Sequence, residues 1–322
     1  MFRKEKSPLP SKLLVISSNP KDHIFAQELG REIEREIQVT NSAASIEQTL
    51  IDEPQTIVLL EADDLAVFRQ HAKMIYGRVS RSRVFIVTNN PLNEYPGLFE
   101  VQIFGHHLRR RFSPPAARVI GKIMLASVSP NPFGIERYFS PDDDVRVQKI
   151  DLNLSSKKTP AVEAVRNFLS KTGTADRLAS KVAQAADELL MNAIYDAPVL
   201  KDGTHYRHGV SRQSSFDIDG GVTLSFAEAE TYAAISVMDA FGSVDREKIM
   251  FCLKKDYREA NYIVRPSAQG VGLGLSSIIL SDLSIQIITR PKMKTEAVLF
   301  FPKVSKFKDI RTSFNFFGVI GL

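Results

Sequence analysis

The chain has 322 residues, which is long enough for two domains, and its 43% hydrophobic and 25% charged content is that of an ordinary folded, soluble protein. Its single cysteine, Cys252, excludes an intrachain disulfide and a zinc site built from cysteines. The net charge of +5 permits a nucleic-acid partner but does not argue for one, and no apolar run reaches the roughly 18–20 residues that span a bilayer. We therefore expect a cytoplasmic protein with no signal peptide and no membrane segment.

The first half of the chain alternates short apolar runs with segments of helical spacing. The apolar runs predict strands at residues 13–16, 37–40, 56–60, 83–87 and 101–104. Helical patterns lie at residues 22–33, 45–50, 65–76 and 114–126. We expect Asp22 to cap the first of these helices. Five strands that alternate with helices predict a doubly wound parallel sheet.

In this strand order, roughly residues 11–127 resemble the receiver domain of bacterial response regulators, and we expect residues 1–127 to form this receiver-like domain. Receivers carry an acidic pair after the first strand to hold magnesium, but residues 17–19 of this chain are Ser-Ser-Asn. Glu61 or Asp63 lies near the place of the phosphoacceptor aspartate, and Thr88 matches the switch threonine. Because a divalent ion would find too few hard oxygen ligands, we expect a pseudo-receiver that is not phosphorylated and serves for docking or dimerisation.

The densest basic run is Arg109-Arg110-Arg111, beside His106 and His107. It stands where a receiver has a lysine-proline pair, which is missing here. We interpret the run as the solvated end of a helix or strand. No helix with interleaved aromatic residues follows it, so we do not expect nucleic-acid binding.

The second half of the chain begins after a stretch rich in Pro, Ser and Asp, residues 128–144, which indicates a linker. Beyond it, the pattern predicts a strand at 145–154, helices at 160–171 and 175–197, and strands at 222–226, 232–238, 285–289 and 297–301. Helices followed by grouped strands predict an α+β domain over residues 145–322. We expect its phenylalanine-rich tail to pack on this domain; the alternatives are an added strand or an apolar patch for a partner or a second copy.

Glu188 and Asn192 are four residues apart on a predicted helix, so they share one face, one turn apart. The amide oxygen of Asn192 can ligate magnesium, which prefers oxygen ligands. The carboxylate of Glu188 can act as a general base. Taken alone, the pair is better explained as an exposed polar stripe on the helix.

Asp239 ends an alternating strand and is followed by Gly242. A carboxylate there can accept the exocyclic amine of adenine, although an Asp before a Gly also forms ordinary turns. Gly270, Gly272 and Gly274 then precede an apolar helix. Glycines let backbone amides approach phosphate oxygens at a helix N-terminus, although they also permit close helix packing.

Together and in this order, the three elements resemble the GHKL ATPase/kinase superfamily, whose Bergerat-type α/β sandwich binds ATP. Residues 188–193 look like its N box. Asp239 and Gly242 look like its first glycine box, and residues 270–275 look like its second. The resemblance covers roughly residues 145–302.

The resemblance implies a role for each of these residues. Asn192 would hold Mg²⁺ between the phosphates of ATP, and Glu188 would be the catalytic base. Asp239 would fix the adenine, with Thr295 nearby on the closing strand. Residues 243–269 would form an ATP lid. Gly270, Gly272 and Gly274 would place backbone amides on the phosphates and act as the hinge of this lid.

The chain departs from the family pattern in two places, one at the adenine-binding aspartate and one where a cation would meet the phosphates. The family separates its aspartate and first glycine by one residue, whereas Ala240 and Phe241 intervene here. The N box usually continues with a basic residue or histidine, whereas Tyr195-Asp196 stands here. Other cations must then meet the phosphate charge, and the candidates are Lys201, Arg207, His208 and Arg265.

Histidine kinases carry their acceptor histidine on a helical hairpin before the ATP domain, where this chain has its Pro-rich linker. The chain is instead similar to anti-sigma-factor serine kinases, in which Glu188 would deprotonate a serine of the partner. We therefore expect an ATP-dependent protein kinase or regulator in bacterial two-component-type signalling. Its partner would be an antagonist, a sigma-factor-like protein or a response regulator. The alternative is a non-catalytic nucleotide-sensing scaffold that acts through protein contacts, homodimerisation included.

Overall fold

The chain is a mixed α/β protein that divides into two compact units, Met1–Pro132 and Phe133–Leu322. The computed structural model describes residues 12–92, 105–113, 116–141, 143, 145–200, 204, 207, 210–211, 214–247, 249–250, 273–281, 283–306, 308–309 and 314–322. The division falls inside the stretch 128–144 that the sequence indicates as a linker. None of the described helices has the length and apolar character needed to cross a bilayer.

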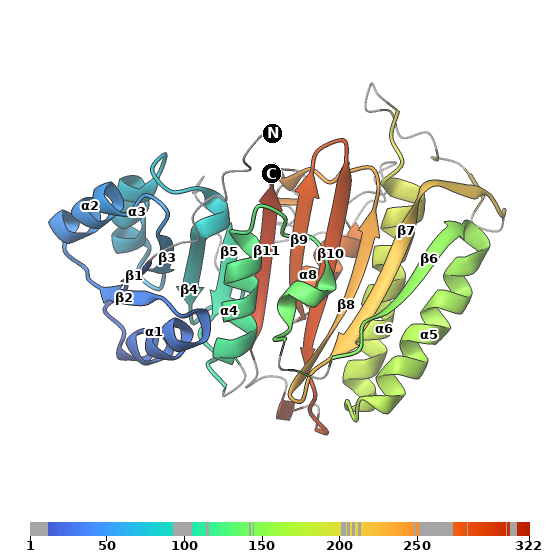
Figure 1. Ribbon diagram of the computed structural model, residues 1–322, viewed down its shortest axis with the longest axis horizontal. Coiled ribbons are helices and arrows are strands. Elements are labelled where there is room, and N and C mark those ends of the chain that lie inside the picture. The colour runs from blue at the N-terminus through green and yellow to red at the C-terminus, as the bar shows by residue number, and fades with distance from the viewer. Residues whose placement is uncertain are drawn as a thin grey trace, which may run out of the picture. The chain divides into compact units, whose positions relative to one another are not determined.

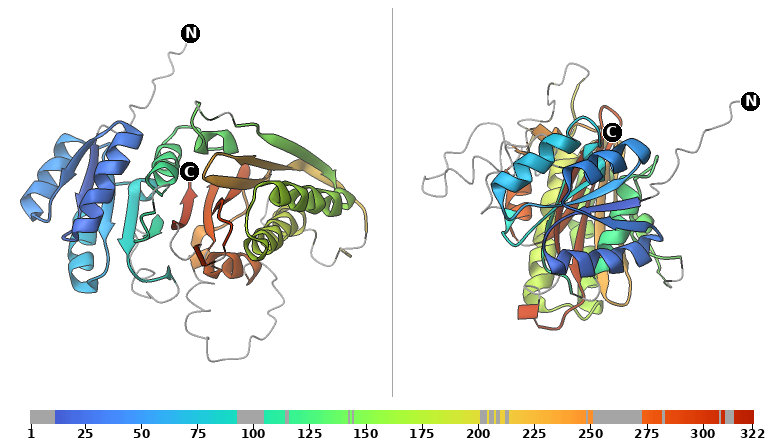
Figure 2. Two further views of the ribbon diagram at one scale, coloured as in Figure 1. Left: turned by 90° about the horizontal axis from the view of Figure 1, so that it is seen from below. Right: turned by 90° about the vertical axis from the view of Figure 1, so that its left-hand side faces the viewer.

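The first unit is a parallel sheet with helices between its strands (Figure 1). Its strands are β1 (Lys12–Ile16), β2 (Glu36–Val39), β3 (Ile57–Glu61), β4 (Val84–Thr88) and β5 (His106–Arg109). They lie in the order β2-β1-β3-β4-β5, and every pair is parallel. The helices are α1 (Pro20–Ile33), α2 (Ala43–Asp52), α3 (Leu65–Ile75) and α4 (Ala116–Ser127). This is a doubly wound arrangement, in which α1 packs with α4 and α2 packs with α3 (Figure 2).

Local sequence signals set the start of the first helix. Pro20 occupies its first turn, and the side chain of Asn19 accepts a hydrogen bond from the amide of Lys21. The prediction that Asp22 caps this helix is therefore wrong, because the capping residue is Asn19. The predicted strand at 101–104 lies outside the described residues, and β5 begins at His106.

The second unit has a mostly antiparallel sheet. Its strands are β6 (Gln148–Leu154), β7 (Asp217–Glu228), β8 (Tyr232–Asp239), β9 (Ser284–Arg290), β10 (Lys294–Pro302) and β11 (Asn315–Gly321). They lie in the order β11-β9-β10-β8-β7-β6, and β11 alone of these runs parallel to its neighbour β9. The helices are α5 (Lys158–Lys171), α6 (Asp176–Met191) and α8 (Leu273–Leu280). The phenylalanine-rich tail thus forms an added strand of its own unit.

Helices α5 and α6 pack together over one face of this sheet (Figure 1). Phe168 of α5 lies on Phe226 of β7, with ring centroids 4.8 Å apart. Phe226 stands opposite Ile235 of β8. Because side chains alternate along a strand, Asp239, four residues after Ile235, lies on the same helix-covered face.

The segment 133–139 covers the opposite face of the sheet. Phe133 packs with Ile288 of β9 and Ile320 of β11. Further along the segment, the ring of Tyr138 meets Phe300 of β10 edge-on, with centroids 4.9 Å apart. The apolar residues of the Pro-rich stretch therefore belong to the core of the second unit.

Candidate functional site

Three polar side chains stand in a row across the helix-covered face of the second unit. Asp239, the last residue of β8, lies directly opposite Thr295 of β10, and Thr295 lies directly opposite Thr289 of β9. Their exposed fractions are 6%, 4% and 4%. A sheet surface inside a protein ordinarily carries apolar side chains, so a buried polar row of this kind needs a partner for its polar atoms.

The Asp239 carboxylate closes a tight turn after β8. Its Oδ1 accepts hydrogen bonds from the amide nitrogens of Phe241 (2.8 Å) and Gly242 (3.1 Å). Gly242 has a φ of 60°, and a Cβ on it would overlap the carbonyl of Arg290. The turn therefore accommodates Ala240 and Phe241 between the aspartate and the glycine, and it requires glycine at 242.

Burial raises the pKa of Asp239 to about 6, although the two turn amides act in the opposite direction. The backbone amide and the hydroxyl of Thr295 also act to lower this pKa, but the hydroxyl makes no hydrogen bond of ordinary geometry to another described residue. The Thr289 hydroxyl also has no hydrogen-bond partner within the described part of the chain. The row therefore offers a carboxylate oxygen and two hydroxyls to a polar ligand.

Glu188 and Asn192 lie at the end of α6. The α-helix ends at Met191, and Asn192 opens a π-helical turn, Asn192–Asp196, in which the amide of Ala197 donates to the carbonyl of Asn192 (2.7 Å). The predicted helix at 175–197 is thus α-helical only to 191. Single π turns inside helices occur frequently at functional sites. Glu188 and Asn192 are both half-buried.

Gly274 lies against Glu188. A Cβ built on Gly274, in the first turn of α8, would overlap the Glu188 carboxylate, so the two predicted site residues touch although 86 positions separate them. The other two predicted glycines, Gly270 and Gly272, and most of the predicted lid lie outside the described residues. Of the predicted site residues, the structure brings Glu188 to Gly274 and Asp239 to Thr295 and Gly242.

Arg207 does not serve as the phosphate-facing cation that the sequence suggested. Its guanidinium donates to the carbonyls of Ile194 (3.3 Å) and Asp217 (2.8 Å) and lies 4.2 Å from the centre of the Phe216 ring. Only 6% of the side chain is exposed. Arg207 thus fixes the π turn to β7. The other candidate cations lie outside the described residues: Lys201, His208 and Arg265.

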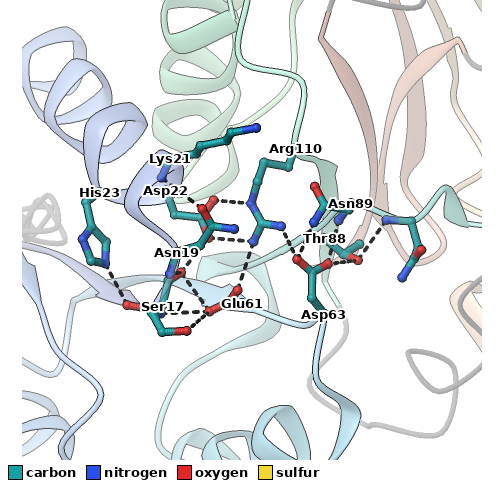
Figure 3. A network of polar contacts seen from close by, with 12 residues as sticks. Ser17, Asn19, Lys21, Asp22, His23, Glu61, Asp63, Thr88, Asn89 and Arg110 are labelled. Atoms are coloured by element: carbon teal, nitrogen blue, oxygen red, sulfur yellow. Dashed lines mark hydrogen bonds and ion pairs between the residues drawn. The ribbon is translucent and has the colours of Figure 1, made fainter.

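The basic run of the first unit is not simply solvated, which corrects the sequence interpretation: Arg109 and Arg111 are half-buried, and the Arg110 side chain and both neighbouring histidines are buried. His106 and His107 are fully buried on β5, and burial lowers the pKa of His106 to about 3 and that of His107 to about 4. The side chain of Arg110 is 1% exposed and is bound by carboxylates from the first turn of α1, the end of β3 and the loop after β3 (Figure 3).

The carboxylates around Arg110 are Asp22, Glu61 and Asp63. Asp22 was missed because the acidic residue was sought directly after β1, whereas it comes from the first turn of α1. The sequence signal that could have pointed to it was an acidic residue in the first turn of the helix that follows β1. Within the described residues, no group of His, Cys, Asp and Glu side chains is arranged to hold a metal ion.

A scan against protein-family models finds no match to this chain, and a search of curated proteins finds no significant match.

Proposed function

We propose that the second unit binds Mg-ATP in a pocket of the GHKL type, with the Bergerat fold. The observation that carries this proposal is the buried row of Asp239, Thr295 and Thr289. A buried carboxylate that keeps one oxygen outside its turn is suited to accept the amine of adenine, and two hydroxyls that have no hydrogen-bond partner among the described residues are suited to complete the edge of a base.

The contact between Glu188 and Gly274 supports the phosphate side of the same pocket. It places a carboxylate from α6 beside the N-terminus of α8, where backbone amides favour phosphate oxygens. The Asn192 amide oxygen is the group that would hold Mg²⁺, which neutralises phosphate charge when bound. Glu188 would accept the proton of an attacking hydroxyl.

The chain would then act as an ATP-dependent protein kinase or regulator of a signalling partner in bacteria, with the receiver-like first unit as a docking module. The partner would be an antagonist, a sigma-factor-like protein or a response regulator. A non-catalytic nucleotide-sensing scaffold is the second candidate. It is favoured by Arg207, whose guanidinium is tied to backbone carbonyls and so is withdrawn from phosphate.

Binding of a fluorescent ATP analogue with Mg²⁺ tests the pocket. Asn192→Ala should abolish Mg²⁺-dependent binding, and Asp239→Asn should weaken binding with or without Mg²⁺. Asn167→Ala, on the exposed side of α5, is the matched control and should bind like the parent chain. Unchanged affinity in both Asn192→Ala and Asp239→Asn would exclude this site.

Incubation with ATP labelled on its γ-phosphate, together with cell extract, separates the two candidates. Label on a partner protein that disappears in Glu188→Ala supports the kinase. Retained ATP binding with no label on any protein supports the scaffold.

A further inference from the structure

The guanidinium of Arg110 lies at the centre of a polar pocket in the first unit (Figure 3). Its Nε donates to Asp22 Oδ1 (2.6 Å) and its Nη2 donates to Asp22 Oδ2 (2.8 Å), so this pair is bidentate. Its Nη1 donates to Asp63, and its Nη2 also reaches Glu61 Oε1 at 3.4 Å. One buried cation therefore contacts three carboxylates, which approach from α1, from the end of β3 and from the loop after β3.

The Asp63 carboxylate has its acceptor positions filled. Oδ1 accepts from the Thr88 hydroxyl (2.8 Å) and the Asn89 amide (2.7 Å). Oδ2 accepts from Asn89 Nδ2 (2.8 Å) and from Arg110. A carboxylate has about four lone-pair positions, so four donors leave none to attack a phosphoryl group or to ligate a metal ion.

The other two carboxylates are also engaged. Ser17 Oγ donates to Asp22 Oδ2 (2.7 Å). Glu61 Oε2 accepts from the Ser18 amide (2.8 Å) and Ser18 Oγ (3.0 Å), and it lies 3.0 Å from Ser17 Oγ, whose single proton Asp22 and Glu61 share. The Ser-Ser segment that replaces an acidic pair thus supplies donors to carboxylates that come from elsewhere.

We propose that Arg110 is the resident cation of this three-carboxylate pocket, so that the first unit requires no divalent ion and accepts no phosphoryl group on Asp63. A hard divalent ion would need the carboxylate oxygens that the guanidinium now occupies, and both cannot be held at once. The residues of the pocket therefore do not fit the metal that a receiver resemblance implies. This proposal does not depend on nucleotide binding by the second unit.

The same geometry predicts what removal of the cation would do. Arg110→Met keeps an unbranched side chain in place of the arginine stem but leaves three carboxylates without their counter-ion. Repulsion among them should then be relieved by a divalent cation, because carboxylates from three segments surround the guanidinium and would need to shift only to reach one ion in its place.

Titration of the nucleotide-free full-length chain with Mn²⁺, followed by electron paramagnetic resonance and by thermal unfolding, tests the proposal. The parent chain and the matched control Arg109→Met should show no tight Mn²⁺ site. Arg110→Met should bind Mn²⁺ at least about tenfold more tightly and should unfold at a higher temperature when Mn²⁺ is present. A variant that folds only in the presence of Mn²⁺ would support the proposal equally.

Adding Asp22→Asn to Arg110→Met should remove the gained site, which assigns it to this pocket. The parent chain should also gain no phosphoryl group from acetyl phosphate and Mg²⁺, as measured by intact mass spectrometry. Tight Mn²⁺ binding by the parent chain, phosphorylation of its Asp63, or a folded Arg110→Met that gains no Mn²⁺ affinity would each overturn the proposal.

Discussion

The Glu188 carboxylate lies against the α-carbon of Gly274, so that α6 and α8 meet at a point where a side chain on one partner excludes the side chain of the other. Glycine at 274 is therefore required by contact and not by backbone conformation, since its φ is not in the left-handed region.

Gly274→Ala should displace the Glu188 carboxylate without unfolding the protein. The added methyl would overlap the carboxylate and Cγ of Glu188, a flexible side chain that can turn away, and the helix propensity gained is about 1 kcal/mol, so the free energy of unfolding should change by about 1 kcal/mol or less. If Glu188 is the base, partner phosphorylation should fall by about 10²–10⁴-fold. Labelled-ATP assays and urea unfolding measure the two effects.

Gly321→Ala is the matched control for this substitution, because a Cβ at that position would meet no neighbouring atom. Combining Gly274→Ala with Glu188→Ala should produce no further loss of activity. Full activity in Gly274→Ala, with activity lost in Glu188→Ala, would contradict the coupling between the two residues.

Asp239 should make nucleotide affinity depend on pH. Its pKa of about 6 means that the carboxylate, the form that accepts the adenine amine, becomes depleted as the pH falls below 6. Affinity for an ATP analogue should therefore fall at acid pH in the parent chain. Asp239→Asn should bind weakly at every pH. Anisotropy titrations between about pH 5 and 8 measure this, and a pH-independent parent chain would contradict it.

The same substitution should stabilise the fold. The pKa of Asp239 is raised from 3.8 to about 6, so the stability that the neutral form provides is lost as the pH rises through this window. Asp239→Asn stays neutral and should raise the free energy of unfolding at pH 7 by up to about 3 kcal/mol, at about 1.4 kcal/mol per pKa unit. Denaturant unfolding of the parent and variant at pH 7 checks the sign, and a less stable variant would contradict the assigned burial of charge.

Strands β1, β3 and β4 of the first unit could be predicted from the sequence because they are continuous apolar runs, whereas the buried strand β5, which carries two histidines, was not predicted. The predicted ranges 56–60 and 83–87 differ from β3 and β4 by one residue at each end. Both faces of a doubly wound sheet are covered, so such strands carry no polar alternation that could be misread.

The Arg110 pocket could not be predicted in the same way, because Asp22 and Arg110 are 88 positions apart. A basic run and a helix-start aspartate each have an ordinary local explanation, and only the strand order brings them together. The polar row across the sheet of the second unit could be predicted in part. Asp239 and Thr295 were expected from the order of the motifs, whereas Thr289 joins the row only through the register of β9 with β10.

His106 and His107 should make the first unit sensitive to acid. Their folded pKa values of about 3 and 4 lie below the ordinary 6.5, so the unfolded chain binds protons that the folded chain cannot. Stability should be constant above about pH 6.5 and should fall as the pH drops, by about 2 kcal/mol per histidine at pH 5. Urea unfolding midpoints of the parent chain at pH 5 and above pH 6.5 measure this difference in stability.

His106→Phe is the informative variant, because His106 already stacks on Phe85 with ring centroids 4.2 Å apart. It should lose about half of the acid sensitivity while keeping the ring contact. A parent chain whose urea midpoint is the same at both pH values would show that these histidines are not buried in solution.

Glu296 links the segment 133–139 to β8 and β10, the strands of the proposed pocket. Its carboxylate, 2% exposed, accepts from the Gly134 amide (2.7 Å) and the Ser236 hydroxyl (2.5 Å). Glu296→Ala would leave both donors unpaired and should lower the free energy of unfolding by about 2–4 kcal/mol. Glu228→Ala, at a partly exposed ion pair with Lys303, is the control and should change the free energy of unfolding by about 0.5–1 kcal/mol or less.

Glu296 faces away from the proposed pocket, yet it directly follows Thr295 on β10 and stands opposite Met238, which directly precedes Asp239 on β8. Loosening of segment 133–139 should therefore disturb the register that aligns Asp239 with Thr295. We expect Glu296→Ala to weaken ATP binding and to speed hydrogen exchange at Gly134 and along β8 and β10. Exchange that accelerates only in segment 133–139, with unchanged ATP affinity, would show that the segment stabilises the unit without controlling the pocket.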